Sequence, residues 1–141
     1  MSAASVASKF PDHLWWLVAL YSVASLVHFS HNAEYIALYP NMPTWISRET
    51  VYVAWLGVAA VGLVSGVLWM LGWRRLAACV LALYGALGLD GLAHYTLALC
   101  SEHSFAMNLT IWSEALMGLA LAGASFWHAC RTRFTAGCAD I

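Results

Sequence analysis

The sequence contains very little charge. Only 9% of its 141 residues are Asp, Glu, Lys or Arg, and 62% are hydrophobic. A soluble domain carries roughly 25% charged residues, so this chain has too few charges to cover a water-facing surface. The net charge of −1 gives no basic surface that would favour a nucleic acid. The composition therefore indicates a membrane protein, and the length allows one domain at most.

Common cysteine motifs are also missing, and we expect no cleavable signal peptide at the start of the sequence. The four cysteines form no CxxC and no CxxCH, which excludes the usual redox dithiol and covalent c-type haem motifs. Only Cys100 falls near the expected outer face, so one chain cannot form a disulfide there. Residues 1–13 show no clear signal-peptide cleavage site, and we expect the apolar run that follows to be retained as a helix.

Four long apolar stretches are present instead, at about 14–37, 51–72, 76–99 and 105–130. Each is near the ~20 residues that a helix needs to cross the hydrocarbon core of a bilayer. The connections between them are short, and short connections favour antiparallel neighbours. The sequence therefore predicts an all-α membrane protein, an up-down-up-down four-helix bundle.

Basic residues predict its orientation. One side of this topology carries Lys9, Arg74, Arg75, Arg131 and Arg133, whereas only Arg48 falls on the other side. Cytoplasmic loops carry an excess of Lys and Arg. We therefore expect a multi-pass protein of the bacterial inner membrane, with both termini cytoplasmic and the loops at 38–50 and 100–104 in the periplasm.

The first apolar stretch ends in a polar segment, Val27–Tyr35, with the sequence VHFSHNAEY. At 100° per residue, His28, Asn32 and Tyr35 fall on one stripe of a helix, and His31 and Glu34 flank it. His28 and His31 are three residues apart, so both imidazoles can reach one centre.

The third and fourth stretches bring further polar groups to a similar depth. Asp90 and His94 are one helical turn apart, and one stripe of the last helix carries His103, Met107 and Glu114. At 1.5 Å per residue, His28 and Asp90 both lie about 21 Å from the inner ends of their helices. Glu114 lies about 14 Å below the outer end. Three helices therefore place ionisable groups in the outer half of the membrane.

These groups predict a metal site with one or two ions. Ionisable residues inside a membrane cost about 2.5–3.5 kcal/mol each on insertion scales, so they need partners. Imidazoles and carboxylates suit zinc, iron or copper. The predicted ligands are His28, His31, Asp90, His94 and Glu114, with Glu34 and His103 as additional ligands or their hydrogen-bonding partners, and Asn32, Tyr35 and Met107 as pocket lining.

Such a site is compatible with several functions. A metal-dependent oxidoreductase or hydrolase acting on a lipid-soluble or small substrate is one hypothesis. A copper- or zinc-handling protein is another, with Cys100 and Met42 at the outer mouth. A b-type haem between His94 and His28 or His31 is less favoured, because buried carboxylates need partners of their own. A metal-free acid–base isomerase uses the same residues.

The same features also have purely structural explanations. His31 and Glu34 suit interfacial positions, and Asp90 with His94 could form a hydrogen-bonded pair that fixes helix packing. Gly85, Gly88 and Gly91 predict close approach of another helix. The lipid bilayer is the expected partner, and the small-residue helix faces allow a homo-oligomer.

Overall fold

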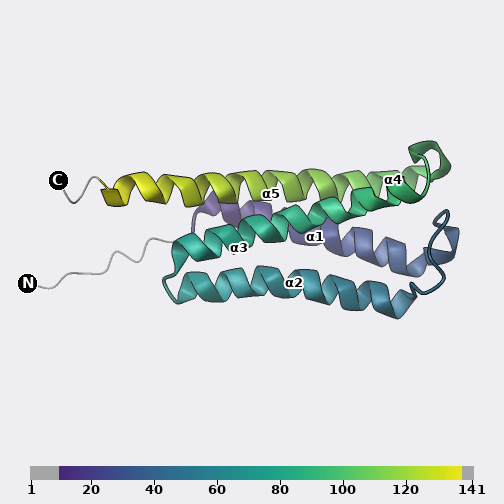
Figure 1. Ribbon diagram of the computed structural model, residues 1–141, viewed down its shortest axis with the longest axis horizontal. Coiled ribbons are helices and arrows are strands. Elements are labelled where there is room, and N and C mark those ends of the chain that lie inside the picture. The colour runs from purple at the N-terminus through teal and green to yellow at the C-terminus, as the bar shows by residue number, and fades with distance from the viewer. Residues whose placement is uncertain (1–9, 138–141) are drawn as a thin grey trace, which may run out of the picture.

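The computed structural model describes residues 10–137, which are helical apart from short turns. Four segments are long and apolar enough to cross a membrane: α1 (Asp12–Glu34), α2 (Arg48–Met70), a third span over Arg74–Leu97, and α5 (Phe105–Gly137), whose apolar span covers Phe105–Arg131. They lie side by side as a bundle (Figure 1). The prediction of an all-α protein is confirmed, as is the prediction of four helical segments long and apolar enough to cross a membrane. Cys138 and residues 1–9, which include Lys9 and most of the segment expected not to be a signal peptide, lie outside the described residues.

Local signals at the helix starts explain why α1 and α2 begin two or three residues earlier than predicted. Pro11 directly precedes α1, and Asp12 places a carboxylate at the positive end of the helix dipole. Ser47 caps α2, because its hydroxyl accepts a hydrogen bond from the Thr50 backbone N–H at 3.3 Å. After α2, Gly72 adopts a φ of 83°, a conformation that favours glycine, and the chain turns directly into the third span.

The third span is not one continuous α-helix, which corrects the prediction for residues 76–99. It consists of α3 (Arg74–Ala86), a seven-residue 3₁₀ helix η2 (Leu87–Ala93) and the short α4 (His94–Leu97). A 3₁₀ helix has three residues per turn, so residues four apart no longer share one line along its surface. Accordingly, the Asp90 side chain is exposed whereas His94 is buried.

Glycines allow the third span to pack closely on its neighbours, as the sequence predicts. A Cβ atom on Gly85 would lie 2.6 Å from the Gly118 carbonyl oxygen of α5. A Cβ atom on Gly88 would lie 2.6 Å from the Tyr21 ring of α1. Both distances are shorter than real Cβ contacts, so α3 approaches α5 at backbone distance and η2 packs directly against the Tyr21 ring of α1.

The outer loops complete the fold. Helix α1 ends at Glu34, so Tyr35 lies after the helix rather than within it, and the 3₁₀ helix η1 (Ile36–Leu38) follows. Tyr39 comes next and is buried, with 3% of its surface exposed. On the other outer turn, the 3₁₀ helix η3 (Cys100–Glu102) leads to a buried His103. Both loops therefore place side chains back into the bundle.

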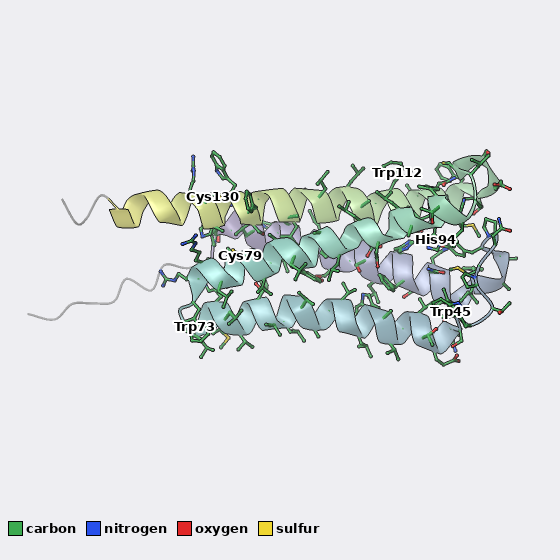
Figure 2. All side chains as sticks on the ribbon, in the orientation of Figure 1. Trp45, Trp73, Cys79, His94, Trp112 and Cys130 are labelled. Carbon is green, nitrogen blue, oxygen red and sulfur yellow. The ribbon has the colours of Figure 1, made fainter. Side chains whose placement is uncertain are left out.

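The two ends of the bundle differ in character. An apolar core fills the half of the bundle in which α1 begins, and it consists of Tyr21, Leu81, Tyr84 and Leu121. His94 lies toward the opposite end, which also carries Trp45, whereas Trp73 and Cys130 lie at the first end (Figure 2). The buried histidines and the buried Glu114 lie outside this apolar core, toward the end that carries His94.

Candidate functional site

The centre of the candidate site is a buried pair, His28 of α1 and Glu114 of α5. Their side chains are 3% and 0% exposed, and His28 Nε2 lies 3.6 Å from Glu114 Oε2. This separation exceeds the 2.7–3.2 Å typical of a hydrogen bond. Both carboxylate oxygens of Glu114 are buried with no hydrogen bond of good geometry among the described residues, although the equally unpartnered Ser25 hydroxyl of α1 lies close enough to interact with the carboxylate. Such a group is costly to bury, so the arrangement calls for a partner.

The hydrogen bonds of Thr110 are linked to which nitrogen of His28 carries the proton. The Thr110 hydroxyl donates its hydrogen to the Met107 carbonyl at 3.0 Å. With its hydrogen placed there, the hydroxyl accepts from His28 Nδ1, which lies 3.3 Å away; in the other tautomer of His28 the hydroxyl donates to Nδ1 instead. In the first arrangement, neutral His28 has its proton on Nδ1 and a free lone pair on Nε2. A lone pair thus faces a carboxylate, and only a proton or a metal cation between them resolves that arrangement.

His94 lies beside this pair. Its ring centroid is 5.6 Å from that of His28 and 4.9 Å from that of Tyr39. Its Nε2 atom lies 3.1 Å from the Asn32 amide nitrogen, which donates to it. The Asn32 carbonyl oxygen, Oδ1, is buried without a hydrogen-bond partner among the described residues. His94 and Asn32 therefore contribute a second pair of functional groups to the site.

His103 repeats the pattern seen at His28. Its Nδ1–H donates to the Leu99 carbonyl at 3.0 Å, and its Nε2 atom is buried with no partner among the described residues. The ring centroid is 6.2 Å from that of His94. An imidazole whose Nδ1–H is held by an oxygen atom, with Nε2 free, is the usual arrangement of a metal-binding histidine.

His31 reaches the site only through Tyr39. Its Nδ1 atom and the Tyr39 hydroxyl share a hydrogen bond of 2.9 Å. Burial raises the pKa of the Tyr39 hydroxyl to about 12, so this group stays protonated at physiological pH. Tyr39 packs between His31 and His94 and lies near His103, with ring centroids 5.9, 4.9 and 6.3 Å away, respectively.

Two predicted ligands lie elsewhere. Glu34 is exposed, and its Oε1 atom accepts hydrogen bonds from Arg48 at 2.7 Å and from the Tyr52 hydroxyl at 2.8 Å. Glu34 is therefore part of a surface network rather than of the buried cluster. Asp90 is exposed in a groove between α2 and α4, and its only partner among the described residues is the Gly91 backbone N–H.

The predicted pocket residues also separate. Asn32 lies in the cluster, as described above. Tyr35 is 50% exposed and packs on His31, with ring centroids 4.8 Å apart. Met107 is buried, and its sulfur accepts a hydrogen bond from the Ser104 N–H at 3.4 Å. Met107 therefore supports the outer turn.

Sequence reasoning missed three contributors to the site: Tyr39, Thr110 and Gly91. Helical spacing groups Tyr39 with the polar residues around His28, and Thr110 with those around Glu114. Their hydroxyl groups were the signal that could have identified them from the sequence. A Cβ atom on Gly91 would lie 3.3 Å from His28 Nε2 and 3.5 Å from Glu114 Oε2. Gly91 therefore borders the space around the pair.

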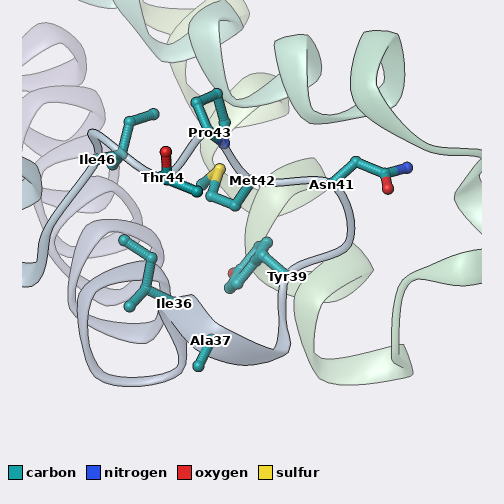
Figure 3. A pocket seen from close by; sticks show the side chains of 8 residues that line it. All are labelled: Ile36, Ala37, Tyr39, Asn41, Met42, Pro43, Thr44 and Ile46. Atoms are coloured by element: carbon teal, nitrogen blue, oxygen red, sulfur yellow. The ribbon is translucent and has the colours of Figure 1, made fainter.

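An outer pocket lies next to this cluster. The loop after α1 borders a shallow, open depression of about 350 Å³ lined by Tyr39, Asn41 and Met42, together with neighbouring residues (Figure 3). Met42 and Ile46 line both this pocket and the groove that contains Asp90. The loop thus forms a thin wall between the outer surface and the groove.

As the side chains stand, no three His, Cys, Asp or Glu residues of the described part of the chain are grouped so that they could hold a metal ion together. The structure instead provides the two-residue pair His28 and Glu114, with His94 and His103 close by. Helices α1 and α5, the short α4 and one outer loop each contribute one of these residues.

The fold and site define the chain as a helical protein with four segments capable of spanning a membrane and a buried histidine–glutamate cluster. No protein-family model, no curated protein and no solved structure matches it.

Proposed function

We propose that this chain binds a transition-metal ion at the His28–Glu114 pair, with His94 and His103 as the nearest further nitrogen ligands. The observation that carries the proposal is the free lone pair of His28 Nε2 facing the unpartnered Glu114 carboxylate at 3.6 Å. Two electron-pair donors face each other at a buried position. A cation between them satisfies both.

The spacing of the pair supports a shared ion. Zinc ligand atoms lie about 2.0–2.1 Å from the metal, and a tetrahedral angle then separates two of them by about 3.4 Å. The observed 3.6 Å is close to this value. The Thr110 contact supplies the outer hydrogen bond that orients a metal-binding imidazole.

Further ligands require a small rearrangement. His94 becomes available to the ion once its Nε2 atom gives up the hydrogen bond with Asn32. His103 already has a free Nε2 atom. Three protein ligands with one open position are typical of a catalytic zinc site. A metal-dependent oxidoreductase or hydrolase acting on a lipid-soluble or small substrate therefore follows as the proposed activity.

The proposed setting is the bacterial inner membrane. The chain crosses it in an up-down-up-down arrangement, with both termini cytoplasmic and the cluster in the periplasmic half. Arg74, Arg75 and Arg131 on one side and Arg48 on the other support this orientation. The bilayer is the partner of the exposed apolar helix surfaces. Self-association through α2 is also proposed, since Gly57 and Gly66 have open space beside them.

A cobalt titration tests the metal proposal. Chelator-treated protein in detergent should develop a visible Co²⁺ ligand-field spectrum that saturates at one or two equivalents. His28→Ala and Glu114→Gln should abolish it. Glu49→Gln, on the exposed first turn of α2, should leave it unchanged. A wild-type protein that folds correctly and gives no such spectrum contradicts the proposal, and a Soret band in the untreated protein would indicate haem instead.

A metal-free acid–base pair is the second candidate function. It is favoured by the lack of a ready three-ligand group among the described residues. In this case Glu114 holds the proton and His28 Nε2 accepts it during turnover. Infrared spectroscopy distinguishes the two candidates. A C=O stretch of a protonated carboxylic acid that disappears in Glu114→Gln supports the acid–base pair, whereas carboxylate bands that shift on metal addition support the metal.

A further inference from the structure

A groove on the membrane-facing side of the bundle reaches the candidate site. It lies between α2 and the segment formed by η2 and α4, and it has a volume of about 400 Å³. Its walls are mainly apolar, with Phe29, Val51 and Trp45 among them, and His94 and Asn32 lie at its buried side. This volume falls within the range of small-molecule sites.

Two hydrogen-bond acceptors in the groove lack adequate donors. Asn32 is 8% exposed, and its Oδ1 atom is buried without a partner among the described residues. Asp90 has only the N–H of its neighbour Gly91 within the same part of the chain. Both groups lie within membrane-spanning segments, where unsatisfied polar groups are expensive. An occupant of the groove therefore has to bring a donor.

We propose that this groove binds a small lipid-soluble alcohol or phenol. Its hydroxyl donates to the exposed Asp90 carboxylate, or to Asn32 Oδ1 once that buried amide turns toward the groove, and its apolar body packs against Phe29, Val51 and Trp45. A neutral hydroxyl compound reaches a groove at this depth through the bilayer, whereas a charged amine pays a desolvation penalty on the way. Asp90 is thus assigned to ligand recognition rather than to metal coordination.

The position of His94 connects the groove to the proposed metal centre. His94 lines the groove, and its ring centroid is 5.6 Å from that of His28. A hydroxyl held by Asn32 therefore lies next to a proposed metal ligand. The role of this compound as a substrate rests on the proposed function, but its binding does not.

Fluorescence quenching tests the binding directly. The probes are 6-bromohexan-1-ol and 1-bromohexane, two heavy-atom quenchers that differ by one hydroxyl group. Trp45 lines the groove and is the reporter, and subtraction of the Trp45→Phe signal isolates it from the other seven of the eight tryptophans. The measurement is made with chelator present, so that its outcome does not depend on the metal.

We expect saturable quenching of Trp45 by the bromoalcohol and weak, non-saturable quenching by the bromoalkane. Asn32→Ala and the conservative Asp90→Asn should each raise the half-saturating concentration about three- to tenfold, the size expected of one lost hydrogen bond. Ser113→Ala, which removes a hydroxyl of α5 outside the groove, should not change it. Equal quenching by both probes, or no effect of either groove variant, would overturn the proposal.

The two proposals fail separately in this design. Saturable bromoalcohol binding in chelator-treated protein that gives no cobalt spectrum would support the groove proposal and contradict the metal proposal. A cobalt spectrum together with equal quenching by both probes would support the metal proposal and contradict the alcohol-site proposal.

Discussion

His28 illustrates how one neighbouring hydroxyl affects the chemistry of an imidazole. When Thr110 donates its hydrogen to the Met107 carbonyl, His28 donates from Nδ1 and keeps Nε2 free. Glu114 then faces a lone pair instead of an N–H group. The residue types alone do not determine this, because the tautomer depends on a contact between two helices.

Removing the Thr110 hydroxyl should weaken metal binding. Thr110→Val keeps the side-chain shape and deletes the acceptor of the His28 Nδ1–H. Loss of such an orienting hydrogen bond typically costs 10–100-fold in metal affinity, and we expect a decrease of about that size. Competition with a chromophoric chelator measures it. Ser113→Ala is the matched control on the same helix, and an unchanged affinity in Thr110→Val would contradict the tautomer assignment.

A methyl group at Gly91 should disturb the centre without unfolding the protein. Its Cβ atom would lie 3.3 Å from His28 Nε2 and 3.5 Å from Glu114 Oε2, so neighbours must shift by only a few tenths of an ångström. We expect Gly91→Ala to show near-native thermal stability and a weakened cobalt spectrum. A spectrum identical to that of the wild type would show that the ion does not lie beside Gly91.

The sequence identified some of the clustered residues because depth can be calculated from helix position. His28, His94 and Glu114 come from three helices and meet as expected. Glu34 was placed with them on helical spacing alone, but Arg48 and Tyr52 come from another helix and bind it at the surface. The spacing of residues within one helix does not show which partners from another helix will bind a given side chain.

At the scale of the elements, the third span shows the same limit. Apolar length predicted one helix over 76–99, and the span indeed ends near its predicted limits. The change to 3₁₀ geometry over Leu87–Ala93 was not predictable from hydropathy, because both helix types carry the same apolar residues. The glycines were the only local sign, and they correctly indicated close packing on α5.

The contact between the third span and α5 should tolerate no side chain at Gly118. A Cβ atom there would lie 2.4 Å from the Gly85 carbonyl oxygen, which is backbone and cannot move independently. Overpacking typically costs about 1–3 kcal/mol, so Gly118→Ala should lower the free energy of unfolding by an amount at or above the upper end of this range. Thermal unfolding in detergent measures the change.

Gly123→Ala provides the control on the same helix. No atom lies within 4 Å of a Cβ atom at this position. Alanine also has a better helix propensity than glycine, so the variant should be neutral or slightly more stable. Equal effects of the two substitutions would contradict the backbone-distance packing of α3 on α5.

At the scale of the whole molecule, the proposed orientation determines which side the site serves. Cys100 lies on an exposed outer turn, and Cys79 lies on α3 toward the opposite end. With Cys79, Cys130 and Cys138 replaced by alanine, a membrane-impermeant maleimide should label Cys100 in spheroplasts. The variant that keeps only Cys79 should not react there. Labelling of Cys100 only in inverted vesicles would reverse the orientation.

Metal content is the measurement that tests the central proposal most directly. Elemental analysis by mass spectrometry, on detergent-purified wild type and on His28→Ala, His94→Ala and Glu114→Gln, should find one or two transition-metal ions per wild-type chain. The His28 and Glu114 variants should retain almost none, and the His94 variant should retain less than the wild type. A correctly folded wild-type protein that neither contains a metal nor takes one up would contradict the account.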